Sequence, residues 1–267
     1  MCKECGCGTG GEVQIGNLMA NSGDPASHGA GQHHDHFHPH PHPAPASPHR
    51  VVPLVRAVLE KNDRLAERNR GFFRAKRLLV MNVLSAPGSG KTTFIQRTAE
   101  ALSGRLRIGV IVGDLATEND ANRLRQSGIP VVQVTTGTIC HLEAAMVAQA
   151  ADRLPLDDLD VLIIENVGNL VCPADFDLGE ELRVVLLSTT EGEDKPLKYP
   201  PMFHSAQVAV ITKMDLAEAA GFDLATARGN VQRIAHHAVI FEVSAKSGQG
   251  MEAWLDQVVS WREKARH

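Results

Sequence analysis

The stretch SAPGSGKTT at residues 85–93 decides the fold, because it directly follows the apolar run LLVMNVL at residues 78–84 and opens a helix-like segment. A strand, a glycine-rich turn and a helix start in this order surround a phosphate with backbone N–H groups and a helix N-terminus. We expect a phosphate-binding loop, or P-loop, with Lys91 on the β- and γ-phosphates and the Thr92 hydroxyl on Mg²⁺. The phosphate-holding residues are then Gly88, Ser89, Gly90, Lys91, Thr92 and Thr93. Ser85 replaces the first glycine of G-x-x-x-x-G-K-[ST], so an ordinary glycine-rich turn is the alternative.

Short apolar runs alternate with helix-like stretches from residue 78 onward. The runs lie at residues 78–84, 107–114, 131–135, 160–166, 184–189, 207–213 and 239–244. The helix-like stretches include residues 92–102, 118–126, 141–154 and 251–261. Continuous β-branched runs between helices predict an α/β fold: a mostly parallel sheet covered by helices on both faces, as in P-loop NTPases, with ligands at the carboxyl ends of the strands.

The composition changes abruptly near Arg50. Residues 8–49 are rich in Gly, Pro, Ala and His and have few large apolar side chains. Such a segment cannot bury enough surface to offset its ordering entropy. We therefore expect a disordered, metal-binding tail over residues 1–50, and a nucleotide-binding domain over 51–267 that begins with an outer packing helix at 51–73.

Composition also limits the classes of protein. The chain has 267 residues, 43% of them hydrophobic, and a formal net charge of −4, which argues against a dedicated nucleic-acid binder. No apolar run reaches the roughly 18 residues of a membrane span, and the N-terminus lacks a signal-peptide layout. We expect a cytoplasmic protein without membrane or nucleic-acid partners, in which clustered cysteines bind metal rather than form disulfides.

Two acidic residues end neighbouring predicted strands. Asp114 closes VIVGD and Glu165 closes VLIIE, so both could join Thr92 around Mg²⁺, a cation that prefers hard oxygen ligands. Gly168, in ENVG, could present its N–H to the γ-phosphate as a sensing switch. We expect Lys91, Thr92, Asp114, Glu165 and Gly168 to carry the catalysis; the alternative for each acid is a solvated charge at a strand end.

The base is predicted by TKMD at residues 212–215. An aspartate accepts hydrogen bonds from both N1–H and N2–H₂ of guanine, whereas adenine offers no such donor pair. Asp215 therefore favours GTP over ATP, with Thr212 beside it and the Lys213 stem along the base. Ser244, Ala245 and Lys246 follow the next strand, where a loop can back the guanine.

Cys140, His141 and Cys172 form a second candidate site. Two thiolates and an imidazole suit Zn²⁺ or Ni²⁺. Cys172 lies on the same segment as Gly168, so a bound ion would sense the nucleotide. The alternative is that each cysteine is a small buried apolar residue.

The tail contains further metal ligands. Cys2, Cys5 and Cys7 have a C-x-x-C-x-C spacing, and with the terminal amine they could approach the square-planar geometry that Ni²⁺ accepts. A histidine tract follows, which we interpret as a loose Ni²⁺ store rather than a solubilising linker. Its candidate ligands are His33, His34, His36, His38, His40 and His42.

Together these motifs resemble the hydrogenase nickel-incorporation GTPase family, HypB. The resemblance is carried by the C-x-x-C-G-C terminus, the P-loop, the adjacent Cys140–His141 pair, ENVGNLVCP at residues 165–173 and TKMD. It implies a tight nickel site at Cys2, Cys5 and Cys7, and a weaker Ni/Zn site at Cys140, His141 and Cys172 in a dimer interface. It also implies a nucleotide-dependent homodimer, with the nickel metallochaperone HypA and the large-subunit precursor of a [NiFe] hydrogenase as partners.

The function expected from these residues and the resemblance is GTP-hydrolysing delivery of Ni²⁺ into hydrogenase, with storage on the histidine tract. Turnover should be slow, since no catalytic base or arginine finger is evident near the motifs. A urease-type nickel GTPase is one alternative, although its expected Cys-Pro-His element is absent. A nickel-storage protein and an ATP-dependent partitioning protein are the others. The sequence leaves open whether Lys195 or Lys198 reaches a nucleotide across the dimer.

Overall fold

The computed structural model describes residues 14–15 and 48–265, with side chains from Arg56 onward. The predicted tail ligands lie outside these residues. They are Cys2, Cys5, Cys7, His33, His34, His36, His38, His40 and His42.

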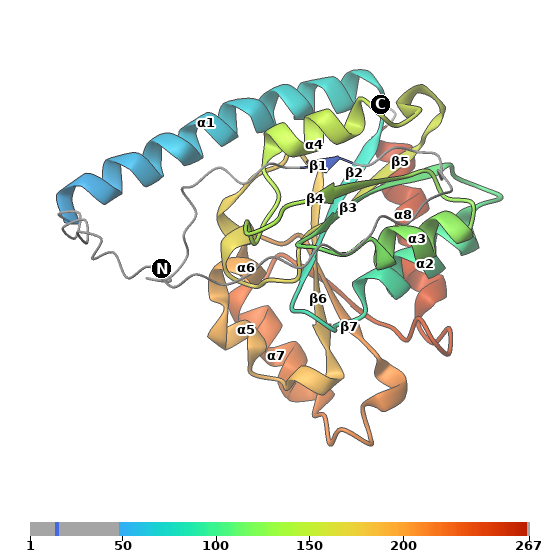
Figure 1. Ribbon diagram of the computed structural model, residues 1–267. Helices are drawn as coiled ribbons and strands as arrows, with labels where there is room; N and C mark the ends of the chain where they lie inside the picture. The colour runs from blue at the N-terminus through green and yellow to red at the C-terminus, as the bar shows by residue number, and fades with distance from the viewer. Residues whose placement is uncertain (1–13, 16–47, 266–267) are drawn as a thin grey trace, which may run out of the picture.

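A single sheet forms the centre of the fold, with strand order β1-β4-β3-β5-β2-β6-β7-β8. Its strands are β1 (Gln14–Ile15), β2 (Leu79–Ser85), β3 (Ile108–Asp114), β4 (Val131–Thr135), β5 (Val161–Glu165), β6 (Leu182–Ser188), β7 (Val208–Thr212) and β8 (Val239–Glu242). All pairs are parallel except β1 with β4. Each of the seven predicted runs forms a strand, which confirms the mostly parallel α/β fold (Figure 1).

Helices cover both faces of this sheet (Figure 1). On one face, α2 (Lys91–Leu102), α3 (Asn119–Gln126) and α8 (Met251–Lys264) pack around Phe94 and Trp254. On the other, α1 (Pro48–Ala75) and α4 (Ala144–Ala151) cover β3, β4 and β5. The short α5 (Lys195–Lys198) precedes α6 (Pro200–His204), which covers β6 and β7 with α7 (Leu224–Ile234).

A buried polar network crosses the middle of the sheet. Asn82 of β2 donates to Glu180 Oε1 at 3.2 Å and accepts from Asn166 Nδ2 at 3.3 Å. Glu180 also accepts from Arg183 Nε at 2.7 Å and from the Leu178 N–H at 2.7 Å. All three core residues, Asn82, Asn166 and Glu180, are at least nine-tenths buried. The network joins β2 to the loop after β5 and to the segment before β6.

Several elements differ from prediction, most clearly at three places. The helix expected at 141–154 starts only at Ala144, because Glu143 is extended and the Ala144 N–H bonds Asn62 Oδ1 of α1 at 2.9 Å. The outer helix expected at 51–73 runs from Pro48 to Ala75. Within the tail expected to be disordered, Gln14–Ile15 form β1, since the edge of β4 offers unpaired backbone groups.

No helix within residues 48–265 is both long and apolar enough to cross a membrane.

Candidate functional site

The P-loop joins β2 to α2 through two left-handed residues. Gly88 has φ 75° and Gly90 has φ 94°, a region in which a side chain is strained. Ser85 is the last residue of β2 and fully buried, and its hydroxyl accepts a hydrogen bond from Lys91 Nζ at 3.0 Å. Serine therefore fits where the sequence pattern has glycine: the backbone here is an extended strand, and the hydroxyl orients the lysine.

Thr92 and Glu165 come together as predicted. The Thr92 hydroxyl donates to Glu165 Oε1 at 2.7 Å, and Glu165 is only 3% exposed. Burial raises the pKa of Glu165 to about 7, against the opposing effects of the Thr92 hydrogen bond and the Lys91 charge. Burial likewise lowers the pKa of Lys91, although Glu165 partly restores it. Within residues 56–265, Glu165 Oε2 has no hydrogen-bond partner, so a hard cation such as Mg²⁺ fits this oxygen.

Asp114 is close enough to affect the charges of Lys91 and Glu165, but its side chain is hydrogen-bonded within the turn that follows it. Its Oδ1 accepts the backbone N–H groups of Ala116 and Thr117, each at 2.9 Å. Its charge still raises the pKa of Lys91 and contributes to the raised pKa of Glu165. Asp114 is therefore near the P-loop, with one oxygen already used by the loop that it caps.

Two residues of α3 were missed by the sequence reasoning. Asp120, in the first turn of α3, influences the pKa of both Lys91 and Glu165 more than Asp114 does. Arg123 Nη2 donates to Thr93 Oγ1 at 3.2 Å, so an arginine lies beside the P-loop. The available signal was an acid and a base three residues apart, just after the strand that ends in Asp114.

The predicted base-binding residues line one cavity of about 350 Å³ next to the P-loop. Its walls include Thr212, Lys213, Asp215, Ala245 and Lys246. Ser244 does not line it, but its hydroxyl donates to Asp215 Oδ1 at 2.6 Å and so orients the carboxylate.

Hydrogen bonds tie this cavity to the P-loop. Lys213 Nζ donates to the Gly88 carbonyl at 2.7 Å, and the Thr212 hydroxyl donates to the Ser89 carbonyl at 2.9 Å. Two hydrogen bonds therefore connect the loop that carries Asp215 to the loop that holds phosphate.

Gly168 packs directly on the P-loop. A Cβ atom at this position would lie 3.1 Å from Pro87 Cα and 3.2 Å from Pro87 N. A side chain here would require Pro87 to shift by a few tenths of an ångström, so the segment after β5 and the P-loop are in close contact.

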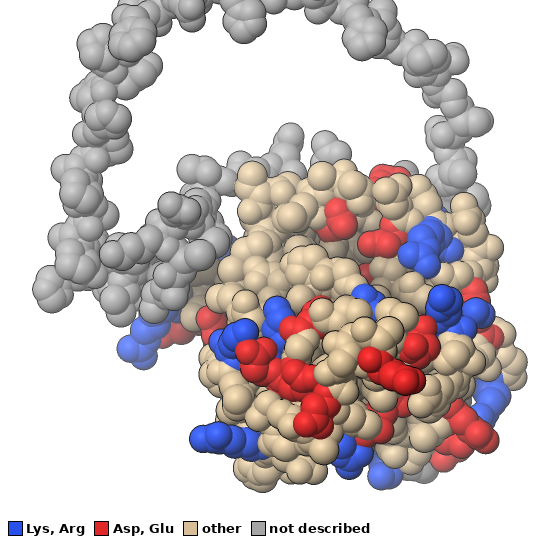
Figure 2. Space-filling view, turned by 90° about the horizontal axis from the view of Figure 1, so that it is seen from below, with Lys and Arg blue, Asp and Glu red and all other residues tan. Residues whose placement is uncertain are grey.

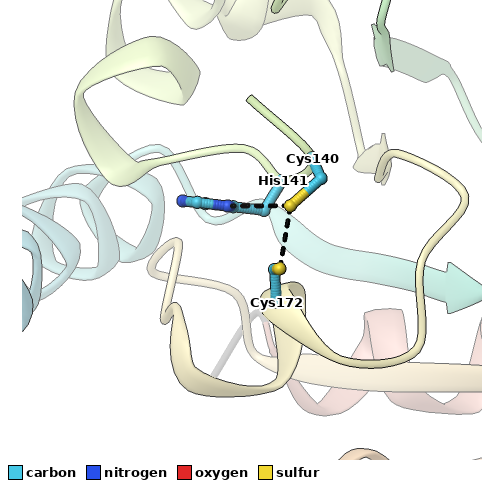
Figure 3. Close-up of side chains that lie close together, drawn as sticks. All are labelled: Cys140, His141 and Cys172. Carbon is cyan, nitrogen blue, oxygen red and sulfur yellow. Dashed lines mark hydrogen bonds between the residues drawn. The ribbon is translucent and has the colours of Figure 1, made fainter. Parts of the chain in front are cut away.

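Cys140, His141 and Cys172 form the predicted cluster (Figure 3). Their ligand atoms all lie within 4.8 Å of one another, with 2.8 Å between the two Sγ atoms and 4.0 Å between Cys140 Sγ and His141 Nδ1. Two thiolates at about 2.3 Å from one ion lie about 3.3 Å apart at a right angle and about 3.8 Å apart in a tetrahedron. The sulfurs thus need to separate by only about 1 Å or less to share an ion.

His141 is prepared to be a neutral ligand. It is 4% exposed and stacks on Phe176 at a ring-centroid distance of 3.8 Å. Burial lowers its pKa to about 4, so the imidazole is unprotonated at neutral pH. Nδ1 faces Cys140, while Nε2 lies 3.9 Å from Glu143 Oε1, a distance too long for a hydrogen bond. Glu143 was not predicted.

Two asparagines join the cluster to the nucleotide side, and neither was predicted. Asn166 follows Glu165 directly, and its Oδ1 accepts the backbone N–H of Leu142, next to His141, at 3.2 Å. Asn169 Nδ2 donates to the Cys140 carbonyl at 3.4 Å. Glu165, Gly168 and Cys172 therefore lie on one short segment whose side chains hold the cysteine–histidine loop.

Figure 2 views the molecule from the side where the loops after β6 and β7 lie. Acidic and basic side chains are interspersed there, and among the described residues no broad basic patch spans this face.

The fold and these contacts define a P-loop nucleotide-binding protein that carries a cysteine–histidine cluster beside its nucleotide site. Residues 79–242 match the family described as CobW/HypB/UreG, nucleotide-binding domain. The hydrogenase maturation factor HypB of Escherichia coli strain K12 is 45% identical over 255 residues, covering 96% of this chain and 82% of that protein. The chain belongs to the HypB family of hydrogenase maturation factors, which confirms the resemblance.

Two solved structures of HypB proteins are similar to this chain, in agreement with the family assignment. The crystal structure of HypB from Helicobacter pylori in complex with nickel has a TM-score of 0.74 and 39% identity, and covers 78% of this chain and 97% of that one. That of hydrogenase maturation factor HypB from Archaeoglobus fulgidus has a TM-score of 0.72 and 41% identity, with 76% and 99% coverage.

Proposed function

We propose that this protein hydrolyses GTP and uses the nucleotide to control delivery of Ni²⁺ to the large-subunit precursor of a [NiFe] hydrogenase. The observation that carries the proposal is the shared segment: Glu165, Gly168 and Cys172 stand within eight residues, one at the P-loop threonine, one on Pro87 and one in the cysteine–histidine cluster. Family membership and a nickel-bound relative support the cargo.

In the nucleotide site, Lys91 and the backbone of Gly88 to Thr93 bind the phosphates, and Asp215 selects guanine with Ser244 behind it. Thr92 and Glu165, with Asp114 close by, are the residues that would hold Mg²⁺, which neutralises charge on the phosphate oxygens. Asp120 is suitably placed to orient the attacking water, and Arg123 adds a positive charge beside Thr93.

In the cluster, Ni²⁺ is cargo rather than a resident cofactor, and Zn²⁺ is chemically suited to the same ligands. A nucleotide can only bias two protein states that bind the ion with different affinity. We propose that a γ-phosphate draws Gly168 and so moves Cys172 relative to Cys140 and His141, and that hydrolysis restores the first arrangement.

The test measures Ni²⁺ affinity with GDP and with a non-hydrolysable GTP analogue, in protein whose Cys2, Cys5 and Cys7 are replaced by Ser. We expect different dissociation constants in the two states, and a smaller difference in Gly168→Ala, whose methyl group presses on Pro87. Gly104→Ala is the matched control, because a Cβ there meets nothing within 4 Å. Equal affinities in both nucleotide states would overturn the proposed coupling.

The partners proposed are a second copy of this chain, HypA and the hydrogenase precursor. Cys140, His141 and Cys172 supply three donors, so a fourth can come from water or the second copy. Leu115 and Val171 are exposed apolar residues next to Asp114 and Cys172, which suits a self-association face. Within one chain Lys198 pairs with Asp194 at 2.6 Å, and that pair would have to open for Lys198 to reach another copy. Sedimentation with GDP and with the GTP analogue tests the dimer.

We further propose cytoplasmic storage of Ni²⁺ on the histidine tract. Deleting residues 28–49 separates this role from delivery. A delivery factor keeps hydrogenase activity when nickel is plentiful and loses only the reserve, whereas a protein that chiefly stores nickel loses its main phenotype.

A further inference from the structure

Histidines outside the predicted sites gather on one surface. Residues 56–265 contain four histidines, His141, His204, His236 and His237, and the last three lie together and are exposed. The ring centroids of His204 and His237 are 5.8 Å apart, and those of His236 and His237 are 5.6 Å apart, with perpendicular rings in both pairs. His204 ends α6, and the other two lie in the turn between α7 and β8.

A backbone contact settles which nitrogen of His204 is available. His204 Nδ1 lies 3.1 Å from the Ile234 carbonyl oxygen. A carbonyl oxygen only accepts, so Nδ1 carries the hydrogen and Nε2 keeps its lone pair. This is the arrangement by which metal-binding histidines are commonly oriented: one nitrogen bonds a carbonyl, and the other faces the ion.

Two of the three ring pairs, both of which include His237, have a spacing close to that of ligands that share one ion. A metal–nitrogen bond of about 2.1 Å puts a ring centroid about 3.2 Å from the ion, so two ligands of one ion have centroids about 4.5 to 5.2 Å apart in square-planar and tetrahedral sites. The observed separations exceed this by about 1 Å, a change that rotation of exposed side chains supplies. We propose that His204, His236 and His237 form a further site for a divalent transition-metal ion, of the borderline class that includes Ni²⁺.

This site is separate from the nucleotide. His204 lies before β7, and His236 and His237 lie before β8, so all three are at the amino ends of strands whose carboxyl ends lead to the base cavity. Its ion therefore enters from solvent on the edge of the sheet opposite Cys140 and Cys172. A site there extends the ion-binding capacity of the chain without using the cysteine–histidine cluster.

The experiment follows each histidine separately in the full chain. Diethyl pyrocarbonate acylates imidazole nitrogens that are not coordinated, and peptide mass spectrometry reads the modification of each residue. Free Ni²⁺ is set with a competing chelator, so that ions held elsewhere do not distort the titration. We expect His204, His236 and His237 to lose reactivity with one common midpoint, in GDP and in the GTP analogue alike.

Variants decide whether the rings share one ion. His237→Ala keeps the bond between His204 and Ile234 and should raise the Ni²⁺ midpoint for His204 by about tenfold or more. Gln232→Ala, an exposed change in α7 just before that turn, should leave it unchanged. Three different midpoints, no protection below millimolar free Ni²⁺, or an unchanged His204 midpoint in His237→Ala would each overturn the site. None of these outcomes bears on coupling at Cys172.

Discussion

Among single residues, Glu165 links the charge of the nucleotide site to the pH dependence of stability. Its pKa is about 7 in the folded chain and near 4.5 when unfolded. Between these values the folded state holds a proton that the unfolded state has lost, so the free energy of unfolding falls as pH rises. Glutamine at this position does not titrate.

We therefore expect Glu165→Gln to gain stability relative to the parent protein as pH rises from 5 to 8, by about 3 kcal/mol at most. Urea unfolding at several pH values, without nucleotide and with a chelator for divalent ions, measures the difference. Parallel stability curves for the two proteins would show that the buried carboxyl does not titrate in this range.

Asp215 gives a prediction about the base. Asparagine replaces one acceptor by a donor, which suits xanthine, whose O2 takes the place of the guanine N2–H₂ group. Asp215→Asn should weaken GDP binding roughly 100-fold and strengthen binding of xanthosine diphosphate. Ser244→Ala, which removes only the hydroxyl that orients Asp215, should weaken GDP binding less and leave the preferred base unchanged. Fluorescent nucleotide titrations distinguish the two variants.

The residues found and missed in the sequence differ in what makes them visible. Lys91, Thr92 and Asp215 stand in patterns with fixed spacing, and the structure brings each to the expected cavity or loop. Asn166 acts through a hydrogen bond to Leu142, which lies in the loop of another strand. Glu143 lies close to His141, two positions earlier in the chain. No spacing in the sequence predicts such a role, because the partner of a polar residue is known only from the folded structure.

At the scale of elements, α1 is held to the rest of the domain by buried amides. Asn69 Nδ2 donates to the carbonyls of Ala144 at 2.8 Å and Leu178 at 3.1 Å. Asn69→Leu leaves both carbonyls without this donor, so we expect a loss of about 1 to 3 kcal/mol in unfolding free energy. Because Ala144 begins α4 just after His141, Ni²⁺ affinity at the cluster should fall as well. A chemical denaturation series with a parallel Ni²⁺ titration checks both.

A substitution at Gly71 of the same helix should stabilise the fold, in contrast to Asn69→Leu. It lies inside α1 and is exposed, and a Cβ atom added there would meet nothing within 4 Å. Gly71→Ala should raise the unfolding free energy by about 0.5 to 1 kcal/mol, since alanine loses less backbone entropy on folding. Thermal and urea unfolding of the two proteins measure the gain. A loss of stability in this variant would mean that the surface of α1 is covered in solution.

The strands were easier to predict than the helix boundaries. A run such as VLIIE is apolar on both faces, and only a buried parallel strand accommodates it. The start of α4 depends on Asn62, distant in the sequence, and β1 depends on an available sheet edge. The local sequence around α4 and β1 carries no information on Asn62 or on the edge of β4.

At the scale of the molecule, the cysteine–histidine cluster exists only in the folded chain, because Cys172 is far from Cys140 in sequence. An ion that binds there stabilises the fold by about 2.7 kcal/mol when free Ni²⁺ is 100 times the dissociation constant. Composition predicts that tail ligands hold ions in folded and unfolded chains alike, so their contribution cancels. Calorimetry should therefore show a smaller Ni²⁺-dependent rise in melting temperature in Cys172→Ser and an unchanged rise in Cys5→Ser.

The amide–carboxylate network of Asn82, Asn166 and Glu180 also fixes the register of the strands around it. The strands around it are nearly interchangeable ladders of Val, Ile and Leu, which could slide past one another at little cost in apolar packing. A slide by two residues keeps every apolar side chain facing inward but separates Asn82 from both partners and leaves polar atoms stranded in the core. Only the observed register satisfies the hydrogen bonds of these polar groups. This register pairs Glu165 with Val83 and so places Glu165 next to the start of the P-loop.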